Sequence, residues 1–291
     1  MVKKKKFTHI AITTSSPDKN IPIIAKQLFE VLKNQNVEIF LDEKLKLGKQ
    51  YKTVSEKVIL KKAGLIIAIG GDGTMLNSSR LYGSAGIPIL GINLGRLGFL
   101  TDIAPEELTS SIIKIIELEY IEDKRFFLET KVTNKKEKAL ALNEVVIHSG
   151  AIAQLIEYNL FIDDEFVYRQ KADGLIIATP TGSTAYSLSG GGPIVHPNLD
   201  VLILMPMFPQ DLSSSPLIVS ADSSIRLELL DKKNKKHLSF DSHNSISFKG
   251  EADVTIKKAK SELSLIHPKD HNFYESCRNK LGWSKSTNRM E

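Results

Sequence analysis

The stretch Leu65-Ile-Ile-Ala-Ile-Gly-Gly-Asp-Gly-Thr74 decides the fold of the first part of the chain. Its unbroken apolar run, Leu65–Ile69, is typical of a strand that is buried on both faces of a parallel sheet. The glycines that follow let the backbone turn tightly, and we expect a helix from Thr74 to about Tyr82. A buried strand, a glycine-rich turn and a helix in this order predict one βα unit of an α/β domain.

The residues on both sides of this stretch continue the same alternation. Upstream, residues 7–13 and 37–41 are apolar segments of strand length, and residues 23–33 between them carry apolar side chains at helical spacing. Downstream, residues 87–92 predict another strand. Strands separated by helices predict a doubly wound, Rossmann-like sheet with right-handed connections.

Beyond Asp102 the chain changes character. We expect one helix over residues 105–118, followed by short strands that are separated by turn signals such as Asn134-Lys135 and Asp163-Asp164. Strands at this spacing predict an antiparallel, sandwich-like β domain. The expected strands cover residues 126–132, 139–148, 155–162, 225–230, 238–240, 245–249 and 254–257.

These two patterns predict two domains. An N-terminal α/β domain covers residues 1–102, and a C-terminal β-rich domain covers residues 103–267. The tail, residues 268–291, has little strand character, and we expect it to pack back on the first domain.

Composition places the chain among ordinary globular proteins. Of its 291 residues, 42% are hydrophobic and 25% are charged, which is enough to build a sizeable core. The single cysteine, Cys277, excludes an internal disulfide and a cysteine-based zinc cage, and it favours a reducing compartment. There is no run of about 18 or more apolar residues, and the start, Met1-Val-Lys-Lys-Lys-Lys6, lacks the apolar stretch of a signal peptide. We therefore expect a cytoplasmic protein that has no membrane partner.

The formal net charge of +5 comes partly from three lysine-rich runs, at residues 3–6, 232–236 and 257–260. A nucleic-acid-binding protein would interleave such residues with aromatic side chains or place them along one helix. Because one run opens the chain and another has the sequence of a hairpin tip, we interpret them as solvated lysines and expect no nucleic-acid partner. A mildly basic field still helps to collect anionic nucleotides.

The glycine-rich loop offers a phosphate site. The start of the following helix presents unpaired N–H groups and the positive end of a dipole, which suits an anion. The predicted phosphate-binding loop consists of Gly70, Gly71, Gly73 and Thr74. Asp72 lies in the same loop although its charge repels a phosphate, which indicates a role as a base or as a magnesium partner. The alternative is a plain strand-to-helix turn in which Asp72 caps the helix.

Several common motifs are absent from the sequence. It contains no Gly-x4-Gly-Lys-Ser/Thr P-loop, no Gly-x-Gly-x-x-Gly Rossmann fingerprint, no His-Glu-x-x-His and no Gly-x-Ser-x-Gly. His267 and His271 are four residues apart but enclose Pro268, so we do not expect them to share a helical face. We interpret them as surface or hydrogen-bonded histidines rather than as metal ligands.

Two further polar segments suit a ligand. Residues 173–193 are rich in glycine and small hydroxyl residues, and an expected strand at 175–179 leads into the loop Thr181-Gly-Ser-Thr184. Hydroxyl and exposed N–H groups suit sugar hydroxyls and phosphates, although a structural loop with hydroxyl caps has the same composition. Asn143-Glu144 lies at the lip of the strand segment Val145–His148. An amide beside a carboxylate is a common way to hold a ribose diol, and a plain surface strand start is the alternative.

Together and in this order, the motifs resemble the bacterial NAD kinase (ATP-NAD kinase) family. The matching segments are Gly70–Thr74, Asn93–Asp102, Asn143-Glu144, Asp173-Gly174, Thr179–Ser187, Leu263–Asp270 and Lys280–Trp283. The first loop alone is shared with diacylglycerol kinase-like and phosphofructokinase-like enzymes. The stretch Thr-Gly-Ser-Thr-Ala-Tyr-Ser with an upstream Asn-Glu is highly specific, and the resemblance extends over nearly the whole chain.

The resemblance implies a kinase that moves a phosphoryl group from ATP, or another nucleoside triphosphate, to the 2′-hydroxyl of NAD and so makes NADP. NAD and ATP are then the substrates, and we expect Mg²⁺ to travel on the nucleotide phosphates rather than in a protein cage. Members of the family are homo-oligomers, commonly tetramers, that have an α/β N-terminal and a β-rich C-terminal domain. The second domain is implied to bind NAD and to form the oligomer.

The resemblance also assigns residues by position. Asp72 matches the general base of the family, and Gly73 lies beside it at the phosphates. Phe99 matches an aromatic residue that lines the adenine pocket, and Asn143 and Glu144 match a pair that contacts the adenosine part of NAD. The remaining implied NAD contacts are Gln154, Lys171, Asp173, Thr181, Thr184, Ala185, Tyr186, Ser187, Leu188, Ser189 and His243.

The resemblance has two further consequences. Lys171 and Asp173 are implied to serve the nicotinamide side of a site across a subunit boundary. Many relatives also carry a basic residue three positions after the loop threonine, where this chain has Asn77. We expect Arg80 or Arg96 to take its place in gripping the triphosphate.

Two other function classes remain open at this point. A lipid or sugar kinase would share the glycine-aspartate loop but would give no role to Asn143-Glu144. A catalytically silent NAD(P)-binding protein would be expected to lack Asp72, which this chain retains.

Overall fold

The structure is a computed structural model that describes residues 7–95, 98–133, 135, 138–150, 154–211, 214–231 and 234–283. The described chain forms two compact units. The first runs up to Lys124 and resumes at Leu263, and the second lies between them. Two strands, β6 (Tyr120–Val132) and β17 (Ala252–Pro268), carry the chain from one unit to the other. None of the described helices is long and apolar enough to cross a membrane.

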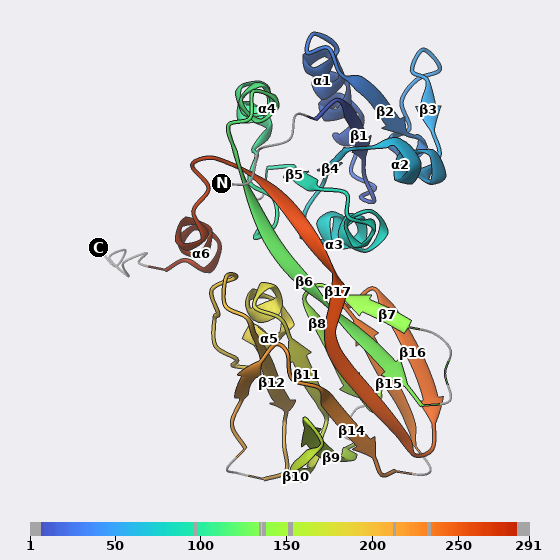
Figure 1. Ribbon diagram of the computed structural model, residues 1–291, viewed down its shortest axis with the longest axis vertical. Coiled ribbons are helices and arrows are strands. Elements are labelled where there is room, and N and C mark those ends of the chain that lie inside the picture. Colours follow the sequence, from blue (N-terminus) through green and yellow to red (C-terminus); the bar gives the residue numbers. More distant parts are fainter. Residues whose placement is uncertain are drawn as a thin grey trace, which may run out of the picture. The chain divides into compact units, whose positions relative to one another are not determined.

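A parallel sheet forms the centre of the first unit (Figure 1). Its strands lie in the order β17-β5-β4-β1-β2-β3, and neighbouring strands run parallel. In addition to the end of β17, this sheet contains β1 (His9–Thr13), β2 (Glu38–Asp42), β3 (Thr53–Val54), β4 (Leu65–Ile69) and β5 (Ile89–Ile92).

Helices cover both faces of this sheet. On one face, α1 (Ile21–Lys33) and α4 (Leu108–Ile116) share an apolar cluster with the odd-numbered residues of β4. On the other face, α3 (Asp72–Leu81) lies against β4 and β5, so closely that a Cβ on Gly91 would meet the Met75 sulfur at 2.9 Å. The buried strand β4 and the expected doubly wound α/β architecture are therefore confirmed.

The first unit ends with α6 (Phe273–Leu281). The side chain of Asn272 caps its start by accepting the backbone N–H groups of Tyr274 and Glu275 at 2.9 and 3.2 Å. Gly282 ends it with a φ of 70°, a left-handed conformation that glycine adopts without strain. Residues 284–291 of the expected tail lie outside the described residues.

The division between the units lies later in the chain than the boundary expected at Asp102. Residues 103–124 belong to the first unit because α4 buries its apolar face in the same cluster as α1. The single helix expected over 105–118 is instead a 3-10 turn, η3 (Pro105–Glu107), followed by the shorter α4. The other short elements of this unit are η1 (Glu43–Leu45), α2 (Glu56–Lys62) and η2 (Gly83–Ala85).

Two antiparallel sheets make up the second unit. One has the strand order β13-β12-β11-β8-β15-β16, and the other joins β10-β9-β14-β17 to β6 and β7. Apolar residues from both sheets share one core, so the expected antiparallel, sandwich-like domain is confirmed. The first sheet contains β8 (Glu144–His148), β11 (Gly174–Ala178), β12 (Val201–Met207), β13 (Leu217–Ser220), β15 (Lys235–Phe240) and β16 (Asn244–Lys249). The second adds β7 (Lys138–Ala141), β9 (Ile156–Ile162), β10 (Glu165–Ala172) and β14 (Ile225–Leu229).

The single strand expected over residues 139–148 is wrong, because the structure divides it into β7 and β8. The carboxylate of Asp241 accepts the backbone N–H groups of Leu142 and Asn143 at 3.0 and 2.8 Å. These groups are satisfied by a side chain instead of by a neighbouring strand, so the ladder is interrupted there.

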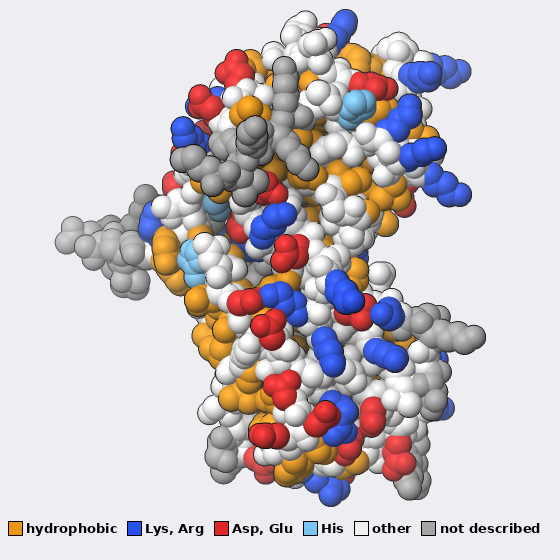
Figure 2. All heavy atoms as spheres, in the orientation of Figure 1, with side chains coloured by type: hydrophobic (Ala, Val, Ile, Leu, Met, Phe, Trp, Pro, Cys, Tyr) orange, Lys and Arg blue, Asp and Glu red, His pale blue; other side chains and the backbone are white. Residues whose placement is uncertain are grey.

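The lysine-rich runs differ in their surroundings. Over the second unit, Figure 2 shows basic side chains lying among acidic ones, and Lys258 pairs with Asp200 at 2.7 Å. Lys236 contradicts the expectation of solvated lysines, because it is buried and its ammonium donates to the Gly250 carbonyl oxygen at 3.0 Å. Residues 3–6 and 232–233 lie outside the described residues.

Candidate functional site

Asp72 begins α3 at the end of β4, where the glycine-rich turn places it. Its carboxylate accepts backbone N–H groups from the loop that follows β5, from Phe99 at 3.1 Å and from Leu100 at 3.0 Å. The helix itself is preceded by Gly71 at the cap position and has no side-chain cap. The carboxylate of Asp72 therefore does not cap α3 but is aimed at the neighbouring loop.

Gly98 makes this arrangement possible. A Cβ on Gly98 would meet the Asp72 Oδ1 at 2.0 Å and the Thr101 Oγ1 at 2.5 Å, which no side chain tolerates. The Thr101 hydroxyl also accepts the Gly98 N–H at 3.1 Å and so fixes the turn. The loop can approach Asp72 only because residue 98 has no side chain.

Lys280, on the last turn of α6, is the cationic partner of Asp72 in the first unit. Its ammonium forms an ion pair with Asp72 Oδ2 and lies 4.4 Å from the centroid of the Phe99 ring. The side chains of Asp72 and Lys280 are 28% and 32% exposed, so solvent still reaches the pair. Phe99, expected at an adenine pocket, thus lies next to the expected base.

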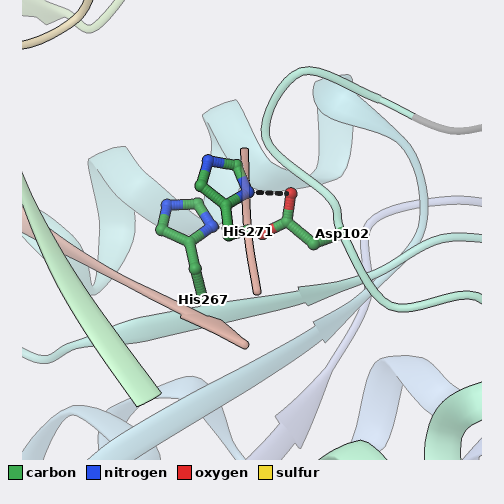
Figure 3. Close-up of side chains that lie close together, drawn as sticks. All are labelled: Asp102, His267 and His271. Carbon is green, nitrogen blue, oxygen red and sulfur yellow. Dashed lines mark hydrogen bonds and ion pairs between the residues drawn. The ribbon is translucent and has the colours of Figure 1, made fainter. Parts of the chain in front are cut away.

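Figure 3 shows the carboxylate of Asp102 beside the imidazoles of His267 and His271. One carboxylate oxygen lies 3.0 Å from His271 Nδ1, and the other contacts His267 Nδ1. Burial raises the pKa of the Asp102 carboxyl, but the two histidines outweigh it and hold that pKa well below its usual value. The cluster ties the end of β17 and the start of α6 to the loop that carries Phe99.

The three donors of this cluster lie within 4.8 Å of one another, as metal ligands do. The two imidazole rings, however, are stacked, with centroids 4.0 Å apart and planes inclined by 19°. A metal ion lies close to the plane of each imidazole that binds it, because the nitrogen lone pair lies in the ring plane. Two stacked rings cannot both meet this condition for one ion, so the cluster is a hydrogen-bonded tether.

In the second unit, Glu144 begins β8 and Asn143 precedes it, beside the carboxylate of Asp241. Burial, followed by the charge of Asp241, raises the pKa of Glu144 to about 8. Asn143 Oδ1 and Glu144 Oε2 are buried and have no hydrogen-bond partner among the described residues. Leaving such atoms unsatisfied costs free energy, so this is a place where a polar ligand would be stabilising.

The hydroxyl-rich loop is only partly available to a ligand. It forms η4 (Thr181–Thr184) and α5 (Tyr186–Ser189). The Thr181 hydroxyl accepts a guanidinium N–H of Arg125 at 3.0 Å, and Ser183 bonds the backbone of Pro180 and Val195. Thr184, Ala185, Leu188 and Ser189 remain partly or fully exposed, whereas Ser187 is buried. The hydroxyls of Thr181 and Ser183 thus already have partners within the protein.

A cavity of about 460 Å³ in the second unit brings two of the expected site residues together. Asp173 and the half-exposed Tyr186 line it, beside His148 and Ser149. Burial and then the charge of the stacked His237 lower the pKa of His148. The other lining residues are Val146, Gly150, Met207, Ser239 and Ser242.

Most of the other expected NAD contacts do not line this cavity, and Gln154, Lys171 and His243 are among them. Gln154 is exposed just before β9. Lys171 lies on β10, with its ammonium 3.8 Å from the Glu157 carboxylate. His243 lies in the turn after β15, where its Nδ1 is 2.7 Å from the Asp241 carbonyl oxygen. Arg96, one of two expected triphosphate contacts, lies outside the described residues.

Family comparisons agree with both units. The model of the ATP-NAD kinase N-terminal domain matches residues 10–120, and the model of the C-terminal domain matches residues 142–268.

The chain belongs to the NAD kinase family.

Curated NAD kinases and solved structures of the family extend the match. The chain is 42% identical to the NAD kinase of Saccharophagus degradans over 97% of its own length and 98% of that protein. Over 98% of this chain and 97% of the relative, it is also 42% identical to the NAD kinase of Coxiella burnetii. An NAD kinase from Archaeoglobus fulgidus in complex with ATP has a TM-score of 0.73 and 29% identity over 93% of this chain and 99% of its own. A yeast NADH kinase complexed with NADH has the same fold, with a TM-score of 0.88 at 24% identity over 99% of this chain and 91% of its own.

Proposed function

We propose that this protein transfers the γ-phosphoryl group of ATP to the 2′-hydroxyl of the adenosine ribose of NAD, which yields NADP and ADP. The proposal rests on membership of the NAD kinase family together with one feature of the first unit. That feature is the carboxylate of Asp72, held by two backbone N–H groups at the head of α3 beside a glycine-rich turn.

Asp72 is the proposed general base. A ribose hydroxyl is a poor nucleophile, so a positioned carboxylate accelerates its attack by accepting its proton. As the bond between the 2′-oxygen and the γ-phosphorus forms, the bond to the bridging oxygen of ADP breaks and the proton passes to Asp72. The two N–H groups from Phe99 and Leu100 keep the carboxylate in place and leave it further lone pairs for the hydroxyl.

The turn formed by Gly70, Gly71, Gly73 and Thr74 is the proposed phosphate cradle. It lies at the start of α3, where free N–H groups and the helix dipole favour an anion. Among residues 70–74, Asp72 supplies the single carboxylate. One carboxylate fits a magnesium ion that is bound mainly through phosphate oxygens. Such an ion would neutralise charge on the phosphates.

The second unit is proposed to hold NAD. Asn143 Oδ1 and Glu144 Oε2 are buried and have no hydrogen-bond partner in the part of the chain that the structure describes, so they can bind the polar groups of an adenosine. Since the pKa of Glu144 is raised to about 8, this carboxyl is largely protonated at neutral pH and can donate as well as accept a hydrogen bond. The cavity beside Asp173 and Tyr186 is proposed for the nicotinamide side.

The remaining NAD contacts implied by the resemblance are proposed with the same roles. They are Gly73, Phe99, Gln154, Lys171, Thr181, Thr184, Ala185, Ser187, Leu188, Ser189 and His243.

We further propose a cytoplasmic homo-oligomer, a tetramer, in which Lys171 and Asp173 complete the site of a neighbouring subunit. An apolar surface supports this proposal. β10 is the edge strand of its sheet, and Phe166 on it is 59% exposed, beside a partly exposed Val167. An exposed edge with large apolar side chains favours pairing with another chain.

A coupled assay tests the proposal. The protein is incubated with NAD, ATP and Mg²⁺, and NADP is detected with an NADP-specific dehydrogenase. We expect NADP to form, and no phosphorylated product when 2′-deoxy-NAD replaces NAD. A folded protein that makes no NADP, or a phosphorylated 2′-deoxy product, would overturn the assignment of the acceptor.

A further inference from the structure

A lysine far from the glycine-rich loop in sequence reaches its aspartate. Lys280 lies on the last turn of α6, and its ammonium contacts Asp72 Oδ2 and covers the ring of Phe99 at 4.4 Å. The contact joins residues that are 208 positions apart, and all three belong to the first unit. The Asn272 and Gly282 caps of α6 do not involve this contact.

The position of Lys280 is set by more than its own side chain. Asn272 caps the start of α6, and the Asp102, His267 and His271 cluster fixes the segment just before that cap (Figure 3). Ser276 and Cys277 bury the inner face of the helix. The ammonium is therefore presented to the loop by a fixed helix rather than by a free tail.

The proposed phosphate cradle needs such a charge. Residues 70–82 contain a single basic residue, Arg80, and it follows Asp72 by eight positions. Eight residues span roughly 12 Å along a helix axis, which places Arg80 at the far end of α3 from the cradle. Without a nearby cation, the carboxylate of Asp72 would repel an incoming polyphosphate.

We propose that Lys280 is a phosphate ligand of the nucleotide-binding site. With no nucleotide bound, its ammonium neutralises Asp72. When a nucleoside triphosphate enters the cradle, the ammonium turns to the terminal phosphate and releases the carboxylate to accept a proton. Lys280 takes no part in bond making, and this inference rests on the proposed function.

Calorimetric titration with Mg-ATP in the absence of NAD tests this role without requiring turnover. We compare wild type with Lys280→Met, Lys280→Arg and a matched control, Arg278→Met, which removes an exposed cation from the same helix. We expect Lys280→Met to weaken ATP binding by about tenfold or more, because a charge-assisted hydrogen bond is lost. Lys280→Arg should restore most of the affinity, and Arg278→Met should bind as wild type does.

Two further measurements separate phosphate contact from other causes. AMP lacks the terminal phosphates, so its affinity should be unchanged in Lys280→Met, and an equal loss for AMP and ATP would assign the effect to packing on Phe99. In an Asp72→Asn background, the loss caused by Lys280→Met should persist. If it disappears there, Lys280 acts only by neutralising Asp72, and the proposed phosphate contact is wrong.

The outcome is distinguishable from failure of the proposed function. If ATP binding depends on Lys280 but the protein forms no NADP, the role of Lys280 as a phosphate ligand stands. The assignment of NAD as the acceptor is then wrong. Unchanged ATP affinity in a folded Lys280→Met variant, with or without NADP formation, would overturn the inference.

Discussion

Glu144 and Asp241 are two buried carboxyl groups that meet at the start of β8. The backbone N–H of Glu144 donates to Asp241 Oδ1 at 3.3 Å, and the N–H of Asp241 donates to the carbonyl oxygen of Glu144 at 3.1 Å. Both residues are 2% exposed, so water scarcely reaches either carboxyl group. Asp241 accepts three backbone N–H groups, whereas Glu144 Oε2 has no hydrogen-bond partner among the described residues.

This pair predicts a pH-dependent stability. The pKa of Glu144 is raised from 4.5 to about 8 in the folded protein, so folding favours the protonated form. The contribution of Glu144 to the free energy of unfolding is therefore fully present below the pKa of the unfolded state. It is lost as the pH rises through the folded pKa of about 8. Urea unfolding of wild type and Glu144→Gln at pH 5 and pH 9 measures the difference, which should turn in favour of the variant at the higher pH. A difference that is equal at both pH values would contradict a raised pKa.

Asp72→Asn should lower kcat by roughly 10²–10⁴-fold, the usual effect of losing a general base. The amide keeps the size of the side chain but cannot accept the proton of the 2′-hydroxyl. The affinity for NAD, measured by calorimetry, should change little. Turnover close to that of wild type would remove Asp72 from the proposed mechanism.

Gly98→Ala should reduce kcat by about 10²-fold, because a Cβ at this position would displace the carboxylate of Asp72. Gly64→Ala is the matched control, since its Cβ would meet its nearest neighbour, the His9 carbonyl oxygen, at an ordinary 3.5 Å. Steady-state kinetics and thermal unfolding of both variants are compared. If both lose activity equally, the close approach of Gly98 to Asp72 is not the cause.

Asp72→Asn and Asp173→Ala subunits, each weak alone, should rescue one another in part when they are mixed and reassembled. Mixed assemblies would contain some sites with Asp72 from one chain and Asp173 from another. Light scattering under the same conditions should show an oligomer. If subunit exchange is demonstrated and the mixture has only the average activity of its parts, Asp173 acts within its own chain.

Local patterns predicted those parts of the fold that depend on neighbouring residues. The run Leu65–Ile69 has no polar position, so it had to be buried on both faces, and the glycines after it required a turn. β12 was not among the expected strands, and it contains a proline, Pro206, a residue that is uncommon inside a sheet. In the structure, Pro206 lies beyond the residues of β12 that pair with β13, so its missing N–H breaks no bond on that side.

Residues that act through distant contacts could not be predicted in the same way. The carboxylate of Asp241 accepts the backbone N–H of Asn143, which lies 98 positions earlier in the sequence. The residues next to Asp241 in the sequence indicate only the end of a strand. Lys280 was visible within a matching segment, but a charge on a short helix does not say which loop that helix reaches. His267 and His271 share no helical face, as expected, but the sequence did not indicate that the turn after β17 stacks their rings beside Asp102.

The first unit is closed by the last part of the chain, because β17 pairs with β5 and α6 brings Lys280 to Asp72. A chain emerging from the ribosome has therefore made every residue of its second unit before its first unit can be completed. Until Leu265 and Ile266 arrive, one side of β5 is an open parallel edge that can pair with another chain. The unit synthesised first is thus the one completed last, and the interval between the two is when a nascent chain is most exposed to misassembly.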